Sequence, residues 1–187
     1  MTTPPRIHDQ ASLLATARDP ADELTLAFAC VIGQALAVGQ RPLIRGLPAA
    51  DFQRLLDAYF PGAGLVNDET AADPALADEL ADLLELLLEF RREPSEALTW
   101  LSHAVASAAL RDNHLWQDMG LPNRALLSAL MTHQFPGLAT LNSGDMKWKK
   151  FFYRKLCERA DVPICKSPHC EQCVDYRACF SHTDDHI

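Results

Sequence analysis

Residues 75–92 read ALADELADLLELLLEFRR, and their spacing is that of an amphipathic helix. The leucines recur near the 3.6-residue helical period at Leu76, Leu80, Leu83, Leu84, Leu87 and Leu88. Acidic residues fill the opposite side at Glu79, Asp82, Glu85 and Glu89. We expect the leucine stripe to pack against other helices and the acidic side to be solvated or to bind a basic partner.

The same period extends over much of the chain, at residues 22–38, 49–59, 96–110 and 122–131. Asp22 stands where an N-cap is expected, and Gly39 where the first of these helices should end. No alternation long enough for a strand is present. The pattern predicts an all-α fold, in which about six or seven helices form a bundle-like body. An irregular cysteine-rich loop should follow this body at the carboxyl terminus.

The charge is distributed unevenly along the chain. The net charge of the 187 residues is −8, but residues 1–144 hold 18 acidic and 9 basic residues. Residues 145–187 hold 7 acidic and 8 basic residues, including all five lysines. We therefore expect an acidic helical body (1–144) and a second unit (145–187) that combines an aromatic and basic helix with the cysteines. Both should pack as one domain.

Several classes of protein are disfavoured by the sequence. The first residues do not resemble a secretory signal, and no run approaches the roughly 20 apolar residues that span a bilayer. We expect a cytoplasmic protein that binds neither membranes nor nucleic acid, because the acidic body would repel phosphates. The motifs GxxxxGK[ST], GxGxxG and GxSxG are absent. No set of nucleophile, base and orienting group can be assembled, so we expect a binding protein and not an enzyme.

Residues 145–161, DMKWKKFFYRKLCERAD, predict one more helix, with Asp145 or Ser143 as its N-cap. One face is apolar and aromatic, with Trp148, Phe151, Phe152 and Leu156. The lysines could simply be solvated, or they could compensate an anionic ligand or dock an acidic protein. The aromatic face should dock on the helical body.

Four cysteines follow, with the spacing C-x4-C-x2-C-x5-C: Cys165, Cys170, Cys173 and Cys179. Four thiolates within fifteen residues cannot share one face of a straight helix, so they must wrap around a common occupant. In the cytoplasm this pattern indicates a metal site or a redox site. Soft thiolates favour an iron–sulfur centre, with mononuclear zinc and a thiol redox site as alternatives.

Two residues near this motif are further candidates for metal ligands, and one more cysteine lies far from it in the sequence. Cys157 precedes the motif by eight residues and could be a fifth ligand, a relay thiol or a buried residue. His169 adjoins Cys170 and could bind a second metal type or be exposed. Cys30 has no other cysteine near it in sequence, so we expect it to be a small core residue.

The motif and its flanks resemble a known family. MKWKKFFYRKLCE (146–158), followed by the four cysteines with KSPHCEQC among them, is similar to the NifQ family of nitrogenase accessory proteins. So are DNHLWQDMGLPNRALLSALM (112–131) and FPGLATLNSGDMKWKK (135–150). The likeness covers roughly residues 112–180.

The resemblance implies a role in nitrogen fixation. It implies a molybdenum-containing iron–sulfur (Mo–Fe–S) cluster held by Cys165, Cys170, Cys173 and Cys179, and delivery of molybdenum for the nitrogenase iron–molybdenum cofactor. The implied recipients are the nitrogenase iron protein and the NifEN assembly scaffold, with molybdate as the molybdenum source.

His114 lies in one of the similar stretches. It could approach the cluster or receive molybdate with help from Arg124, or be a satisfied residue at a helix terminus. A zinc-stabilised protein-interaction module without a transfer role is the alternative function for the chain as a whole.

Overall fold

The computed structural model describes residues 7–68 and 74–159, and within these ranges it contains nine helices and no strand. The helices are α1 (Gln10–Leu14), α2 (Glu23–Ala37), α3 (Ala49–Tyr59), α4 (Pro74–Phe90), α5 (Glu96–Ala109), α6 (Leu115–Asp118), α7 (Arg124–Gln134), α8 (Pro136–Leu141) and α9 (Trp148–Arg159). Six of them have 11 residues or more, and α1, α6 and α8 are shorter. The predicted all-α fold is confirmed. The predicted cysteine loop lies outside the described residues.

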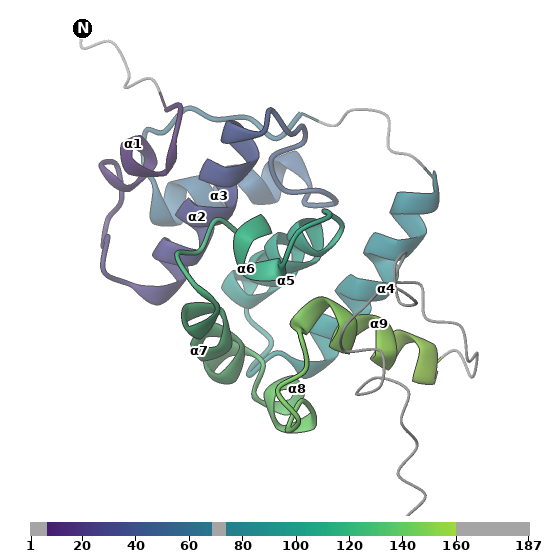
Figure 1. Ribbon diagram of the computed structural model, residues 1–187. Coiled ribbons are helices and arrows are strands. Elements are labelled where there is room, and N and C mark those ends of the chain that lie inside the picture. The colour runs from purple at the N-terminus through teal and green to yellow at the C-terminus, as the bar shows by residue number, and fades with distance from the viewer. Residues whose placement is uncertain (1–6, 69–73, 160–187) are drawn as a thin grey trace, which may run out of the picture.

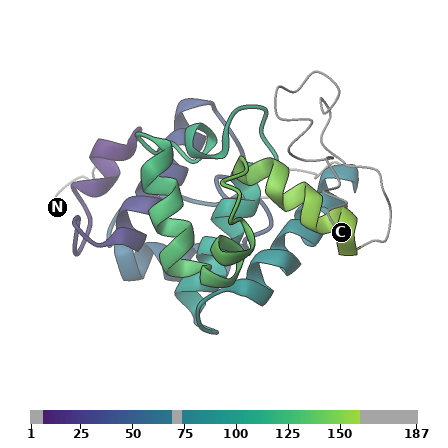
Figure 2. The ribbon, with the colours of Figure 1, turned by 60° about the horizontal axis from the view of Figure 1, so that its bottom comes forward.

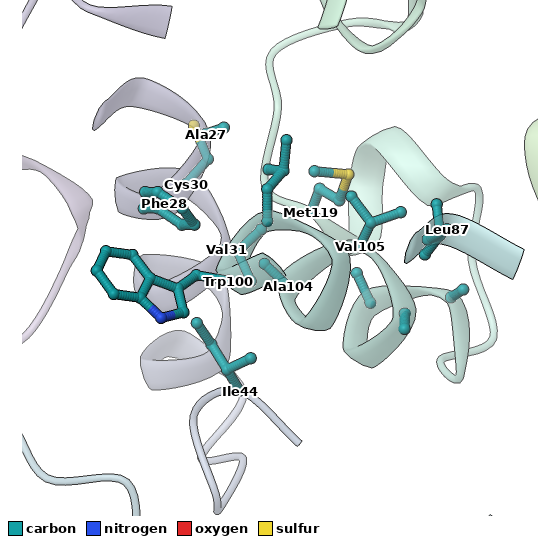
Figure 3. Packing of buried hydrophobic residues seen from close by; sticks show 14 of the residues in the cluster. Ala27, Phe28, Cys30, Val31, Ile44, Leu87, Trp100, Ala104, Val105 and Met119 are labelled. Carbon is teal, nitrogen blue, oxygen red and sulfur yellow. The ribbon is translucent and has the colours of Figure 1, made fainter. Parts of the chain in front are cut away.

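Helix α5 lies at the centre of the fold, with α2, α3, α4 and α6 packed around it (Figure 1). Its residues from Trp100 to Ala109 are buried, because its sequence is apolar or small on nearly every side. Figure 3 shows how side chains of several elements meet there: Ala27, Phe28, Cys30 and Val31 of α2, Leu87 of α4, Trp100, Ala104 and Val105 of α5, and Ile44 and Met119. One continuous core therefore joins helices that are far apart in sequence.

Local sequence signals determine several helix ends as expected. The side chain of Asp22 accepts a hydrogen bond from the backbone N–H of Thr25, and that of Ser95 accepts one from Leu98. Gly39 has a φ of 66°, a left-handed conformation that ends α2 at low steric cost. The predicted cap at Asp22 and the predicted stop at Gly39 are confirmed, and the cap at Ser95 is a finding of the structure.

Helix α9 lies beside α4 at the edge of the body (Figure 2). The prediction that this helix starts at Asp145 or Ser143 is wrong, because α9 begins at Trp148. Asp145 has a φ of 50°, and its carboxylate binds Arg124 instead of capping a helix. Because the Asp145 carboxylate is bound to Arg124, it does not cap the helix.

Candidate functional site

The predicted cluster ligands follow α9 in the sequence. Cys165, Cys170, Cys173, Cys179 and the neighbouring His169 all lie outside the described residues, so their ligand roles stay predictions. Helix α9 ends at Arg159, six residues before the first of these cysteines. Within residues 7–68 and 74–159, no group of three or more His, Cys, Asp or Glu residues could hold a metal ion. The described part of this site is α9, which precedes the cysteine motif in the sequence and which we call its support.

The aromatic face of α9 attaches this support to the body. Trp148 meets Phe151 edge to face with ring centroids 5.8 Å apart, and lies 5.9 Å from the ring of Phe152. All three rings are buried, as is Leu156 one turn further along. The predicted docking of this face on the helical body is confirmed.

A buried ion pair strengthens the same attachment. The ammonium of Lys149 lies 2.5 Å from a carboxylate oxygen of Asp118 and 2.5 Å from the carbonyl oxygen of Arg111. The side chains are 15% and 2% exposed, respectively, so this pair is largely removed from water. The Asp118 carboxylate also accepts hydrogen bonds from the backbone N–H and the side-chain amide of Asn113, at 2.9 and 3.1 Å. The carboxylate is thus fully engaged, as a buried charge requires.

Burial lowers the pKa of Lys149, while the hydrogen bond and the charge of Asp118 favour its protonated form. The sequence left three interpretations of the lysines open: solvation, compensation of an anionic ligand, or docking of an acidic protein. Lys149 instead pairs with a carboxylate of the same chain, 31 residues earlier. A signal was present in the sequence: Lys149 shares a helix face with Phe152 and Leu156, at spacings of three and seven.

The acidic side of α4 binds α9 at two points. The hydroxyl of Tyr153 donates a hydrogen bond to Glu79, and the guanidinium of Arg159 pairs with Glu89. Arg159 also lies over the ring of Phe90, 5.9 Å from its centroid. For these two carboxylates, the basic or hydrogen-bonding partner is therefore a helix of the same chain.

The two cysteine thiols of the described region have different surroundings. Cys30 of α2 lies in the core (Figure 3). The side-chain amide of Gln10 donates a hydrogen bond to its Sγ at 3.1 Å. Burial raises the pKa of this thiol to about 11, so it is protonated at neutral pH. The prediction of a core cysteine is confirmed. Cys157 lies on the last turns of α9 and is half-buried, and its ligand role stays a prediction.

His114 and Arg124 have separate environments. His114 is exposed and precedes α6 as its N-cap residue, where its backbone N–H donates to the side chain of Gln117 at 3.2 Å. The guanidinium of Arg124 binds the carboxylate of Asp145 at 2.8 Å and its carbonyl oxygen at 2.7 Å. The observed position of His114 is the helix terminus that the sequence allowed. Its proposed contact with molybdate stays a prediction.

A second polar cluster, which the sequence reasoning missed, lies at the carboxyl-terminal end of α5. Arg45 donates to the carbonyl oxygen of Ser107 at 3.3 Å, and Arg111 donates through Nε to the side-chain oxygen of Gln40 at 2.8 Å. Gln40 and Ser107 are buried and contact one another at 3.4 Å. The available signal was the polar stripe His103, Ser107 and Arg111, with four-residue spacing in an otherwise apolar segment.

Comparison with known proteins identifies the family. The family model described as NifQ matches residues 27–181, which begin within α2, include α3 to α9 and contain all four cysteines of the motif. The chain belongs to the NifQ family. Protein NifQ of Azotobacter vinelandii is 38% identical over 154 residues, covering 74% of this chain and 78% of that protein. Protein NifQ of Klebsiella pneumoniae is 36% identical over 155 residues, covering 76% of this chain and 89% of that protein.

The family assignment extends the resemblance that the sequence stretches suggested. It reaches back from residue 112 to residue 27, so the helical body belongs to the family as well as the cysteine region. The NifQ name places the chain among proteins of nitrogen fixation. No solved structure matches the chain. Among the described helices, none has the length and apolar character needed to cross a membrane.

Proposed function

We propose that this chain carries an Mo–Fe–S cluster and supplies molybdenum for synthesis of the nitrogenase iron–molybdenum cofactor. The observation that supports the proposal is the C-x4-C-x2-C-x5-C motif inside the region that matches the NifQ family. Thiolates are the ligands of iron–sulfur clusters, and four of them at short spacing form one compact donor set. We assign this role to Cys165, Cys170, Cys173 and Cys179.

The chemistry of this donor set fits a carrier. Four thiolates can hold the iron and sulfide part of the cargo, while the molybdenum keeps a ligand that a recipient can replace. Helix α9 supports this arrangement, because its buried aromatic face and the Lys149–Asp118 pair fix the segment from which the motif extends. Cys157 on the same helix and His169 inside the motif are our candidates for additional ligands.

The proposed role requires partners and no catalytic turnover. The recipients would be the nitrogenase iron protein and the NifEN scaffold, and the molybdenum would enter as molybdate. We place the delivery in the cytoplasm. His114, which is exposed on α6, is a candidate to contact the incoming molybdate.

Single alanine variants of the four motif cysteines test the ligand assignment. Each protein is produced and purified without oxygen, and its iron, sulfide and molybdenum are measured per chain. We expect each variant to lose a large part of all three, because each removes one thiolate of a shared donor set. Cys30→Ala is the matched control, since Cys30 is a core residue outside the motif. Full metal content in all four motif variants would contradict the assignment.

A further inference from the structure

The cluster at the end of α5 is a built arrangement of polar groups. The backbone N–H of Arg45 donates to the hydroxyl of Ser107 at 3.0 Å, and its guanidinium donates to the Ser107 carbonyl oxygen. The side-chain amide of Gln40 holds the same hydroxyl and the carbonyl oxygens of Pro42 and Leu43. The other end of the Gln40 amide accepts from Arg111. Gln40 thus holds the guanidinium of Arg111, while the backbone carbonyl oxygen of Ser107 holds that of Arg45.

These arginines form no direct ion pair. Neither has a carboxylate within ion-pair distance in the described part of the chain, whereas Arg54 pairs with two carboxylates and Arg92 and Arg124 with one each. Arg111 instead donates to the backbone carbonyl oxygen of Asp118 at 2.6 Å. The Asp118 carboxylate is already bound by Lys149.

The two guanidinium groups also disfavour one another. Burial lowers the pKa of both Arg45 and Arg111. For Arg111 the negative charge of Asp118 opposes this effect, and the positive charge of Arg45 adds to it. The Nη2 atom of Arg111 is buried and has no hydrogen-bond partner among the residues that the structure describes. A half-buried pair of like charges with an unsatisfied donor is costly unless a further group balances it.

An anion would supply this balance. A guanidinium presents its N–H donors in a planar fork that matches the oxygens of an oxyanion, and two forks can hold one tetrahedral dianion. Arg45 and Arg111 are only partly buried, so part of each side chain is exposed to solvent. The chain has a net charge of −8, so an excess of cations here is not a general property of its surface.

We propose that Arg45 and Arg111, held in place by Gln40 and Ser107, form a binding site for a tetrahedral inorganic oxyanion. The donors are the guanidinium groups, and contact with the buried Nη2 of Arg111 requires the Arg111 side chain to move. The site lies on the helical body and uses none of the motif cysteines, so it does not rest on the proposed function. Sulfate, phosphate and molybdate share the chemistry that it recognises.

Titration calorimetry of the full chain with each of these three anions tests the proposal, with chloride at matched ionic strength as the reference. We expect saturable one-to-one binding of at least one oxyanion and none of chloride. Arg45→Gln should weaken binding about tenfold or more, because it removes one of the two forks. Arg54→Gln is the matched control, since Arg54 lies on α3 and pairs with Asp51 and Glu96. It should leave the affinity unchanged.

A variant with alanine at all four motif cysteines separates this site from the cluster site. Retained oxyanion binding in that variant, together with loss in Arg45→Gln, supports the site on the body. Binding that disappears with the cysteines would overturn the proposal while leaving the cysteine assignment intact. Absence of saturable binding to the unmodified chain, or equal affinities in Arg45→Gln and Arg54→Gln, would overturn it as well. A preference for molybdate over sulfate would connect the site to molybdenum supply.

Discussion

The two ends of α9 are attached to the body by different kinds of contact. At its start, the buried Trp148 and the Lys149–Asp118 pair lie among other buried groups. At its end, Arg159 pairs with Glu89 near solvent, and Glu158 binds Arg154 and Lys155 within the same helix. The contacts at the start of α9 are shielded from water, whereas water screens the ion pairs at its end.

This difference indicates that the start of α9 is rigid and that its end can open more easily. A buried ion pair that loses one partner leaves an uncompensated charge, so the start of α9 should open only when much of the body unfolds. Exposed ion pairs break at small cost, so the last turn of α9 should open more easily. The cysteine motif follows this last turn in the sequence. The proposed cluster-binding segment thus follows the less strongly held end of α9 in the sequence.

Removal of the buried carboxylate should have the largest effect on stability. Asp118→Ala leaves the ammonium of Lys149 and the amide of Asn113 without their partner, and we expect a loss of about 3–5 kcal/mol in the free energy of unfolding. Urea denaturation followed by circular dichroism measures it. Asp112→Ala, which removes a neighbouring exposed carboxylate, should change the stability by less than about 0.5 kcal/mol. Equal losses in the two variants would show that burial does not distinguish them.

The middle of α9 should give an intermediate effect. Tyr153→Phe removes the hydroxyl that donates to Glu79 and keeps the ring in place, so we expect a loss of about 1–2 kcal/mol. A double-mutant cycle with Glu79→Gln isolates the contribution of this contact. If the two substitutions are strictly additive, the hydrogen bond contributes nothing to holding α9 on α4.

Near the outer end, Glu89→Gln should cost less than about 1 kcal/mol, because its pair with Arg159 is exposed to solvent. The loss should shrink further in high salt, where exposed charges are screened. Denaturation at low and high sodium chloride checks both points. A salt-independent loss as large as that of Asp118→Ala would contradict the contrast between the two ends.

The smallest expected effect depends on pH and involves Glu158. Burial alone would raise the pKa of this carboxyl, but hydrogen bonds and charges from Lys155 and Arg154 lower it below its usual 4.5. A lowered folded-state pKa contributes stability that is complete above 4.5 and is lost as the pH falls through the folded value. The stability difference between the unmodified chain and Glu158→Gln should therefore be present at about pH 7 and vanish once the pH falls below the lowered pKa of the folded state. A constant difference would exclude this ionisation as its source.

Local and periodic features of this fold were predictable from the sequence, whereas long-range polar contacts were not. The leucine spacing around Leu83, the cap at Asp22 and the core position of Cys30 each depend on nearby residues, and each is confirmed. The partners of Lys149 and Asp145 are 31 and 21 residues away, respectively. No local pattern indicates such pairs, because only the packed body brings them together. The missed start of α9 has the same cause.

The candidate site follows the same division. The spacing of the four cysteines is a local pattern, and it led to the family that the comparison then identified. The cluster around Arg45 and Arg111 combines a loop after α2 with the end of α5, 66 residues apart in sequence. In the sequence, each arginine looks like an ordinary charged residue. Only the contacts with Gln40 and Ser107, which form in the folded chain, distinguish these two from other arginines.

The metal content of the unmodified chain, purified without oxygen, tests the central claim most directly. Iron, molybdenum, zinc and acid-labile sulfide are measured per chain in one preparation. A Mo–Fe–S carrier should contain iron and sulfide in comparable amounts together with molybdenum, and little zinc. One zinc per chain with no sulfide would contradict the account and support a zinc-stabilised interaction module.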